Sequence, residues 1–157
     1  MEETYSTFDI VGGMGIKIER LKDWMRRGYI QPSIQVAQGS GTKNLFNQKD
    51  LYQLGLFIFL INRGFSREEA AKHARAVHRI IEPAWEDEDM GKEETLKSEG
   101  FLTLAYREGN FCSGGMVKNT GDTIAVEADE NCDEVLLVNY GKLCQQVDGA
   151  VGRMKRD

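Results

Sequence analysis

The stretch that decides the fold of the first half of this chain is GIKIERLKDWMRRG, residues 15–28. Its apolar residues recur at the spacing of one helix face and are Ile18, Leu21, Trp24 and Met25. This period predicts an amphipathic helix over residues 17–27, with the apolar stripe packed on a small core. Gly15 suits a tight turn into the helix, and Gly28 suits the position just after its C-terminus.

A shorter helix is expected immediately before this stretch, from Phe8 to Gly13, with the hydroxyl of Thr7 as its N-cap. The glycines that follow permit positive φ and therefore a tight turn. Two short helices joined in this way form a helix-turn-helix, whose second helix enters the major groove of DNA. Residues 17–27 are therefore predicted to be a recognition helix, and the alternative is an ordinary charged, solvated helix face.

The charged residues of the predicted recognition helix flank its apolar stripe. On one side are Lys17, Arg20 and Arg27, on the other are Lys22 and Arg26, and between these flanks lie Glu19 and Asp23. Cations on both flanks can reach phosphates on both walls of a groove. A carboxylate between them can accept from a cytosine amino group or orient an arginine.

A hairpin is expected after the recognition helix. Residues 33–37 alternate polar and apolar side chains as a strand does, residues 38–42 have turn chemistry, and residues 43–46 can return as the partner strand. A hairpin in this place is a wing. The predicted wing, residues 34–46, would contact the DNA backbone or the minor groove.

Two longer helices complete the expected N-terminal domain, residues 1–81. Asn47 can cap a helix over 48–63 that is apolar nearly all round, as a central core helix is. Ser66 and Glu69 form a capping box that opens a helix to about Ile81. Pro83 is expected to end this domain.

The second half of the chain has the period of strands. Residues 82–100 read as an acidic linker, and residues 101–157 as a small antiparallel sheet with one helix. The expected elements are strands over 101–106, 111–117 (with a bend at Gly114-Gly115), 123–127 and 135–138, and a helix from Asn139 or Tyr140 to Met154. The fold class predicted is α+β, with a mostly helical winged helix-turn-helix followed by this small domain.

Neither the histidines nor the cysteines have the spacing of a metal site. His73 and His78 are expected on an exposed helix face with no ligand partners. Cys112, Cys132 and Cys144 are odd in number and lack a CxxC motif, so each is expected to be a small buried hydrophobe. We therefore expect no metal and no cofactor.

Charge is distributed unevenly along the chain, whose formal net charge is −5. Through Ile81 twelve Lys and Arg face eight Asp and Glu, a balance of +4, whereas the remainder has eight against seventeen, a balance of −9. A basic first half fits a phosphate-binding module joined to a module with another partner. No apolar run has membrane-spanning length and no signal peptide is visible, so a soluble cytoplasmic protein is expected. No enzyme motif is present either, so catalysis is not expected.

Several short motifs, taken in order, resemble the N-terminal domain of MerR-family transcription regulators. They are Thr7 to Val11, Gly15-Ile16, Leu21, Trp24, Gly28 to Pro32, Phe46, Asp50-Leu51 and Arg63 to Ser66. The resemblance covers about the first 80 residues. It implies a winged helix-turn-helix that binds an inverted-repeat operator as a dimer.

The resemblance also suggests which residues face DNA. Together with the helix and turn patterns, it predicts a DNA-binding set of Lys17, Glu19, Arg20, Lys22, Arg26, Gln38, Ser40, Lys43 and Asn44. Asp23 stands where the family usually has a tyrosine, and the wing holds one lysine where the family has an arginine pair. Pro83 and the acidic linker replace the family's long dimerisation helix, so the chain is closer to divergent MerR-like proteins with a small C-terminal domain.

The function predicted from the sequence is sequence-specific DNA binding in transcription regulation. The expected partners are double-stranded DNA and a second copy of the chain, through residues 123–127 or the last helix, with a contact to RNA polymerase left open. One alternative is a phage-type excisionase or small-terminase-like architectural protein. Another is a protein-interaction module that no longer binds DNA, which Asp23 and the negative total charge favour.

Overall fold

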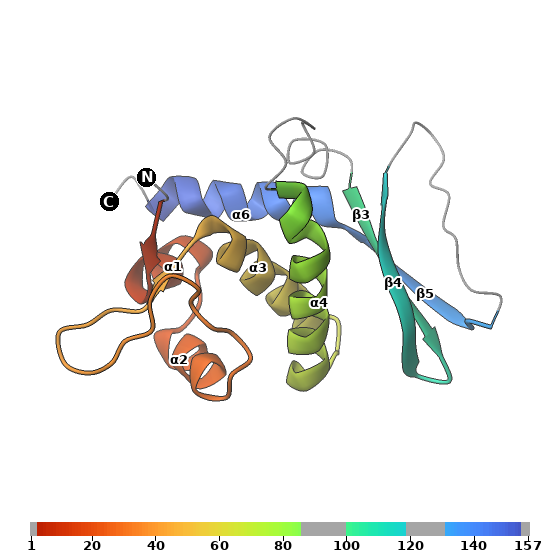
Figure 1. Ribbon diagram of the computed structural model, residues 1–157, viewed down its shortest axis with the longest axis horizontal. Helices are drawn as coiled ribbons and strands as arrows, with labels where there is room; N and C mark the ends of the chain where they lie inside the picture. Colours follow the sequence, from red (N-terminus) through yellow and green to blue (C-terminus); the bar gives the residue numbers. More distant parts are fainter. Residues whose placement is uncertain (1–2, 86–99, 119–130, 155–157) are drawn as a thin grey trace. The chain divides into compact units, whose positions relative to one another are not determined.

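The computed structural model describes residues 3–85, 100–118 and 131–154. Within these residues the chain is α+β, with five helices and two small antiparallel sheets, and the helices lie mostly in the N-terminal half (Figure 1). The predicted α+β class is therefore confirmed. The chain divides into two compact units: unit 1 comprises Met1–Ile80 together with Gln146–Asp157, and unit 2 comprises Ile81–Gln145.

Unit 1 begins with strand β1 (Tyr5–Ser6) and helix α1 (Thr7–Met14). The N-cap is Ser6, so the prediction of Thr7 is wrong by one residue. Ser6 Oγ accepts from the backbone N–H of Asp9, and the Asp9 carboxylate accepts from the Ser6 N–H at 2.6 Å. This reciprocal pairing needs an acid three residues after the cap, which Ser6 has and Thr7 lacks.

Helix α2 (Ile18–Arg26) follows after a short turn, close to the predicted bounds of 17–27. Gly15 ends α1 with φ of 66°, in the left-handed region that glycine enters at little cost. Gly28 has φ of 74° after α2, and the N–H groups of Gly28 and Tyr29 donate to the carbonyls of Met25 and Trp24. This pattern closes the helix by satisfying two carbonyls of its last turn. The predicted role of Gly28 is confirmed.

Helix α2 is attached to unit 1 by its apolar stripe. Leu21 is fully buried and Trp24 is 2% exposed, whereas Ile18 and Met25 are half-buried. The Trp24 ring meets the edge of Phe57 with ring centroids 5.0 Å apart. Such aromatic pairs add to the stability that burial alone provides. The predicted stripe is therefore the packed face of α2, and the opposite face remains exposed.

Helices α3 (Gln48–Asn62) and α4 (Arg67–Trp85) form the rest of the helical core. Asn47 caps α3, as predicted, and it does so in a capping box with Asp50. Helix α4 continues through Pro83 to Trp85, so the predicted end at Pro83 is wrong. Proline removes one backbone donor, and with only two helical residues after it the loss is confined to the last turn. The rest of the predicted linker, residues 86–99, lies outside the described residues.

The predicted wing is a loop rather than a hairpin. Residues 33–37 form no strand, and only Gln35 bridges to Leu45. Strand β2 (Leu45–Phe46) instead pairs with β1, and it buries Phe46 completely. Backbone pairing across the loop is limited to the bonds of Ile34 and Gln35 with Leu45. The loop extends away from α1, α2 and α3 (Figure 1).

Helix α6 (Tyr140–Met154) occurs where a final helix was predicted, and its last turns belong to unit 1. The sequence grouped residues 101–157 in one domain, whereas the polar contacts of α6 connect its end to α1 and α3. Asp148 Oδ1 accepts from the Tyr52 hydroxyl at 2.5 Å and from Gln48 Nε2 at 2.8 Å. Arg153 donates to the Gly13 carbonyl at 3.0 and 3.3 Å. Apolar residues of the same turns, Val147, Ala150 and Val151, are buried.

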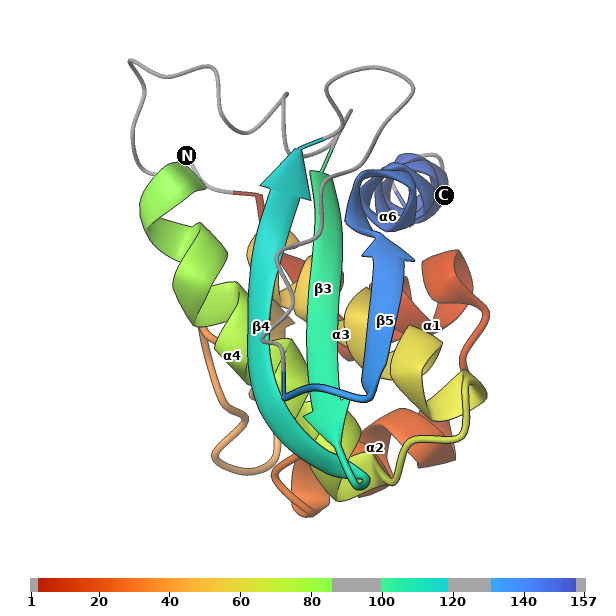
Figure 2. The same ribbon diagram turned by 90° about the vertical axis from the view of Figure 1, so that its right-hand side faces the viewer.

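Unit 2 contains a three-stranded antiparallel sheet of strands β3 (Gly100–Arg107), β4 (Asn110–Lys118) and β5 (Glu134–Asn139), in the order β4-β3-β5 (Figure 2). Strand β4 stays paired with β3 through Gly114-Gly115, so the pairing has no break at the predicted bend. The register instead shifts between Ala105 and Tyr106. A Cβ on Gly114 would lie 3.1 Å from the Thr103 carbonyl oxygen, so glycine serves close strand packing here. The predicted strand over 123–127 lies outside the described residues.

Candidate nucleic-acid interface

The residues predicted to bind DNA lie in two places on unit 1. Those on and beside α2 are exposed, and they are Lys17, Glu19, Arg20, Lys22 and Arg26. Those in the predicted wing are Gln38, Ser40 and Lys43, which are exposed, and Asn44, which is half-buried. The two groups belong to one compact unit, and both can be reached from solvent.

Asn44 has a structural role in the predicted wing. Its side-chain oxygen accepts from the backbone N–H of Ala37 at 2.9 Å across the loop. Near the tip, Thr42 Oγ1 accepts from the Gln38 N–H at 2.8 Å and donates to the Gly39 carbonyl at 2.9 Å. Such side-chain bonds take the place of a ladder of backbone bonds. Asn44 therefore shapes the loop and leaves Lys43 as its exposed cation.

Arg20 is positioned by the packed face of α2. Its guanidinium carbon lies 5.3 Å from the centroid of the Trp24 ring, within the range of a cation–π contact. Because Trp24 is buried against Phe57, the arginine is supported by the core while its charged end stays in solvent. A supported cation loses less side-chain entropy on binding than a free one.

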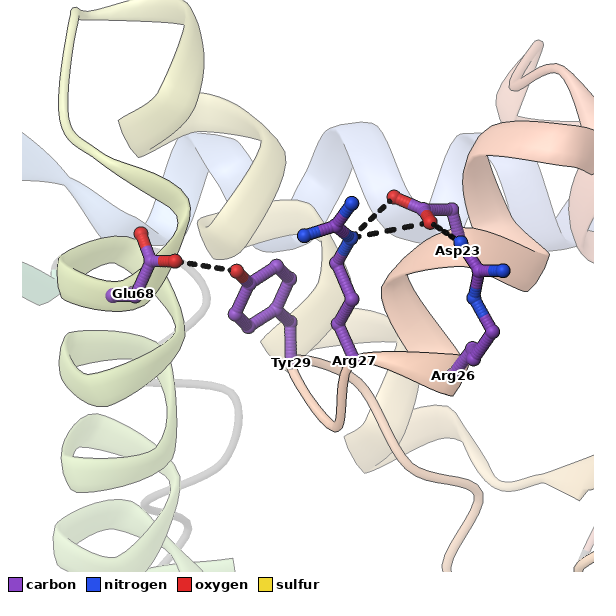
Figure 3. Close-up of polar contacts among 5 residues, drawn as sticks. All are labelled: Asp23, Arg26, Arg27, Tyr29 and Glu68. Carbon is purple, nitrogen blue, oxygen red and sulfur yellow. Dashed lines mark hydrogen bonds and ion pairs between the residues drawn. The ribbon is translucent and has the colours of Figure 1, made fainter.

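Asp23 joins two arginines in the last turn of α2 (Figure 3). Its Oδ1 lies 2.5 Å from Arg26 Nη2, and its Oδ2 lies 3.0 Å from Arg27 Nε. Hydrogen bonds from Arg26 and then Arg27 lower the pKa of Asp23 below its ordinary value. The carboxylate therefore orients arginines, one of the two roles that the sequence predicts for an acid between the basic flanks.

Tyr29 extends this polar group to helix α4. Its hydroxyl donates to Glu68 Oε1 at 2.6 Å. The same bond raises the pKa of Tyr29 and lowers that of Glu68, because it favours the protonated phenol and the ionised carboxylate. Figure 3 shows Arg27 between Tyr29 and Asp23, so polar side chains run continuously from α2 to the start of α4.

A groove of about 430 Å³ lies beside these residues. Its lining is contributed by α2 and the residues after it, by the end of α3 and by the start of α4, and consists of Arg20, Arg27, Tyr29, Ile61, Asn62, Phe65, Ser66, Arg67 and Glu68. Three arginines against one glutamate give the lining an excess of positive charge. The first turn of α4 adds the partial positive charge of a helix N-terminus. The groove is therefore electrostatically suited to an anion.

Part of this arrangement was not predicted from the sequence. The predicted DNA-binding set does not contain Arg27, Tyr29, Arg67 or Glu68. The pairing of Asp23 with Arg27 could have been found, because residues four apart on a helix are neighbours. The pairing of Tyr29 with Glu68 spans 39 residues and has no local signal.

Two predictions about the burial of histidine and cysteine side chains are wrong. His73 is buried against the edge of Phe65, with ring centroids 5.8 Å apart, rather than exposed. Cys112 is exposed and Cys132 is half-buried, while Cys144 alone is buried as predicted. The apolar stripe of α4 is wider than its sequence period implies, and Cys112 lies on β4, an edge strand. Within residues 3–85, 100–118 and 131–154, no three His, Cys, Asp or Glu side chains gather as metal ligands would.

Comparison with models of known protein families and with curated proteins finds no match for this chain. In the described parts of the chain, every helix is too short or too polar to cross a membrane. The case for function therefore depends on the residues of unit 1.

Proposed function

We propose that unit 1 is a winged helix-turn-helix that binds double-stranded DNA, with α2 in the major groove and the predicted wing on the backbone or the minor groove. The observation that carries the proposal is the division of α2 into two faces. Leu21 and Trp24 hold one face in the core, while the other presents exposed cations. A helix fixed in this way can enter a groove without leaving its own core.

The charge of the proposed DNA-binding helix supports a phosphate partner. Residues 17–27 contain five Lys and Arg and two Asp and Glu, a balance of +3 in a chain whose total is −5. Arg20, Lys22 and Lys17 point to solvent and are suited to phosphates or base edges. Lys43 adds a cation from the predicted wing. Its neighbours at the tip are small and polar, which suits close approach to a backbone.

The biological role proposed is transcription regulation by a homodimer on an inverted repeat. Its support is the ordered resemblance of the first 80 residues to MerR-family regulators. A two-fold symmetric protein binds two half-sites about one helical turn apart. The dimer contacts are proposed to lie in unit 2 or along α6.

The test is selection of bound sequences from a random pool of duplex DNA, followed by affinity measurements on the enriched sequence at several salt concentrations. We expect an enriched inverted repeat and an affinity that falls steeply with salt, because each neutralised phosphate releases counterions. A pool without enrichment contradicts sequence-specific binding. Enrichment of phased direct repeats instead supports the architectural alternative.

Two substitutions separate base reading from backbone contact. Arg20→Ala should relax base preference or weaken binding to the enriched site by about 1–3 kcal/mol, because an arginine pair to guanine contributes that much discrimination. Lys43→Ala should weaken binding to all sequences alike and lower the salt slope by about one unit. Thermal unfolding of each variant is the control for folding. If Arg20→Ala binds like the wild type, α2 does not read bases through this residue.

A protein-interaction module is the second candidate. The observation that favours it is the pairing of Asp23 with two arginines, which reduces the free positive charge of α2. In that case the selection yields no enriched sequence and binding to duplex DNA is absent at low salt. The two candidates are therefore separated by the same experiment.

A further inference from the structure

Asp23 lies on the charged side of α2, where a carboxylate opposes the approach of a phosphate. In the free protein the Asp23 carboxylate forms ion pairs with Arg26 and Arg27 of the same helix end. Both arginines are well exposed, with side-chain exposures of 77% and 53%. We propose that Asp23 is an internal counterion that holds these two arginines in the free protein and gives them up to DNA phosphates. This inference rests on the proposed DNA binding.

The geometry of Arg27 favours such an exchange. Both hydrogen bonds from Arg27 to Asp23, at 3.0 and 3.2 Å, use Nε. Figure 3 shows one terminal nitrogen of Arg27 on the side of Tyr29, and neither terminal nitrogen is used in the bonds to Asp23. An arginine can therefore turn its terminal nitrogens to a phosphate, which it binds through paired N–H groups. Exposed ion pairs are weak, so such a pair can be exchanged for a phosphate.

Glu68 is a second acid of this polar group, and unlike Asp23 it lines the groove. It accepts a hydrogen bond from the Tyr29 hydroxyl, and the charges of Arg27 and Arg67 add to the lowering of its pKa. Arg27 and Glu68 both line the groove. A phosphate that binds Arg27 competes with Asp23 for that arginine, and one that binds the Tyr29 hydroxyl competes with Glu68. Asp23 has the larger effect because it holds two cations.

The consequence is that Asp23 restrains DNA affinity and makes it less sensitive to salt. An arginine that is already paired with a carboxylate contributes less to counterion release when DNA binds. Removing the carboxylate should therefore strengthen binding and steepen the salt dependence. A residue with only a structural role in α2 would weaken binding when it is replaced, and it would leave the salt slope unchanged.

The experiment compares Asp23→Asn and Asp23→Ala with Glu108→Gln in the full chain. Glu108→Gln removes one negative charge from the exposed turn between β3 and β4 and is the control for total charge. On the sequence selected by the wild type, both Asp23 variants should bind on the order of three- to tenfold more tightly near 0.1 M salt. Their salt slopes should steepen by about one to two units, or about 0.9 per phosphate gained. Glu108→Gln should match the wild type.

Glu68→Gln provides a graded comparison, because the glutamine keeps an acceptor for Tyr29 and removes the charge. Its effect on affinity should have the same sign as that of Asp23→Asn and be smaller. Unchanged or weaker binding by folded Asp23 variants, with wild-type binding intact, would falsify the counterion role alone. A changed base preference without a steeper slope also overturns it, because Asp23 would then read a base. Absence of DNA binding by every protein ends both this role and the proposed function.

A readout without DNA tests the arrangement in the free protein. The Asp23 carboxyl carbon, followed by NMR through an acid titration, should titrate below the ordinary range in the wild type and return towards it in the double variant Arg26→Gln, Arg27→Gln. An ordinary titration of Asp23 in the wild type would show that the arginines are not held, and it would overturn the inference whether or not DNA binds.

Discussion

Helix α2 and the predicted wing are attached to the same unit in different ways. Helix α2 is fixed by buried side chains, with Leu21 and Trp24 inside the core. The predicted wing is held by the bridge of Gln35 to Leu45 and by side-chain bonds such as that of Asn44 to the Ala37 N–H. Apolar burial contributes several kilocalories per mole for a large side chain, whereas a hydrogen bond in contact with water contributes about 1 kcal/mol.

Helix α2 and the predicted wing both present exposed cations, but α2 is anchored more strongly to unit 1 than the predicted wing is. A substitution under α2 disturbs the core of unit 1, whereas a substitution in the predicted wing disturbs the loop alone. Local opening of a protein follows the same rule, since segments with few buried contacts open at low free energy.

The largest effect is expected for Trp24→Ala. Loss of a buried tryptophan removes its burial and its edge contact with Phe57, and should lower the free energy of unfolding by about 3–5 kcal/mol. Denaturant unfolding followed by circular dichroism measures the loss. Met25→Ala, at a half-buried position of the same helix, is the matched control and should cost clearly less. Equal costs would show that α2 is not held chiefly through Trp24.

A smaller effect is expected from His73, which packs on Phe65 next to the groove. Burial lowers the pKa of His73 below 6.5, so the folded protein resists a proton that the unfolded chain accepts. The stability contributed by neutral His73 is intact above about pH 6.5 and is lost as the pH falls below it. His73→Leu should flatten the decline in melting temperature between pH 7 and 5. His78→Leu retains His73 and should keep the decline, and a flattening there instead contradicts this account.

The smallest effect on global stability is expected for Asn44→Ala. The loop loses the bond to the Ala37 N–H, while the core residues beneath it are untouched. The free energy of unfolding should change by less than about 1 kcal/mol, and hydrogen exchange at the Ala37 amide should become faster. Ser40→Ala, at the exposed loop tip, is the control and should leave that amide unchanged. A large global loss would mean that the predicted wing is part of the core.

Much of the helical structure could be predicted from the sequence. The bounds of α2 and α3 follow from apolar period and from local end signals, namely Gly28 after α2 and the capping box of Asn47 with Asp50 before α3. These signals lie within four residues of the feature they decide, so a single sequence contains them. Strands β3 and β5 followed from alternation for the same reason.

The features that were not predicted depend on contacts between residues that lie far apart in the sequence. Strand β2 pairs with β1, some 40 residues earlier, a pairing that has no local signal in the sequence. Asp148 and Arg153 are surface-like residues in sequence, yet they bond to α3 and α1 across 96 and 140 residues. The burial of His73 likewise depends on Phe65 and the helices around it. The candidate site was predicted where it lies on α2 and missed where it reaches α4.

The bond between Arg153 and the Gly13 carbonyl has a consequence for the order in which the protein can be completed. During synthesis, the segments of α1 to α4 leave the ribosome long before residues 146–154 exist, so unit 1 lacks Val147, Val151 and the Arg153 contact until α6 has been made. Contacts across 140 residues also form slowly, because a large loop must close first. A chain that terminates early therefore displays the surface of α2 on an incomplete core, open to proteolysis.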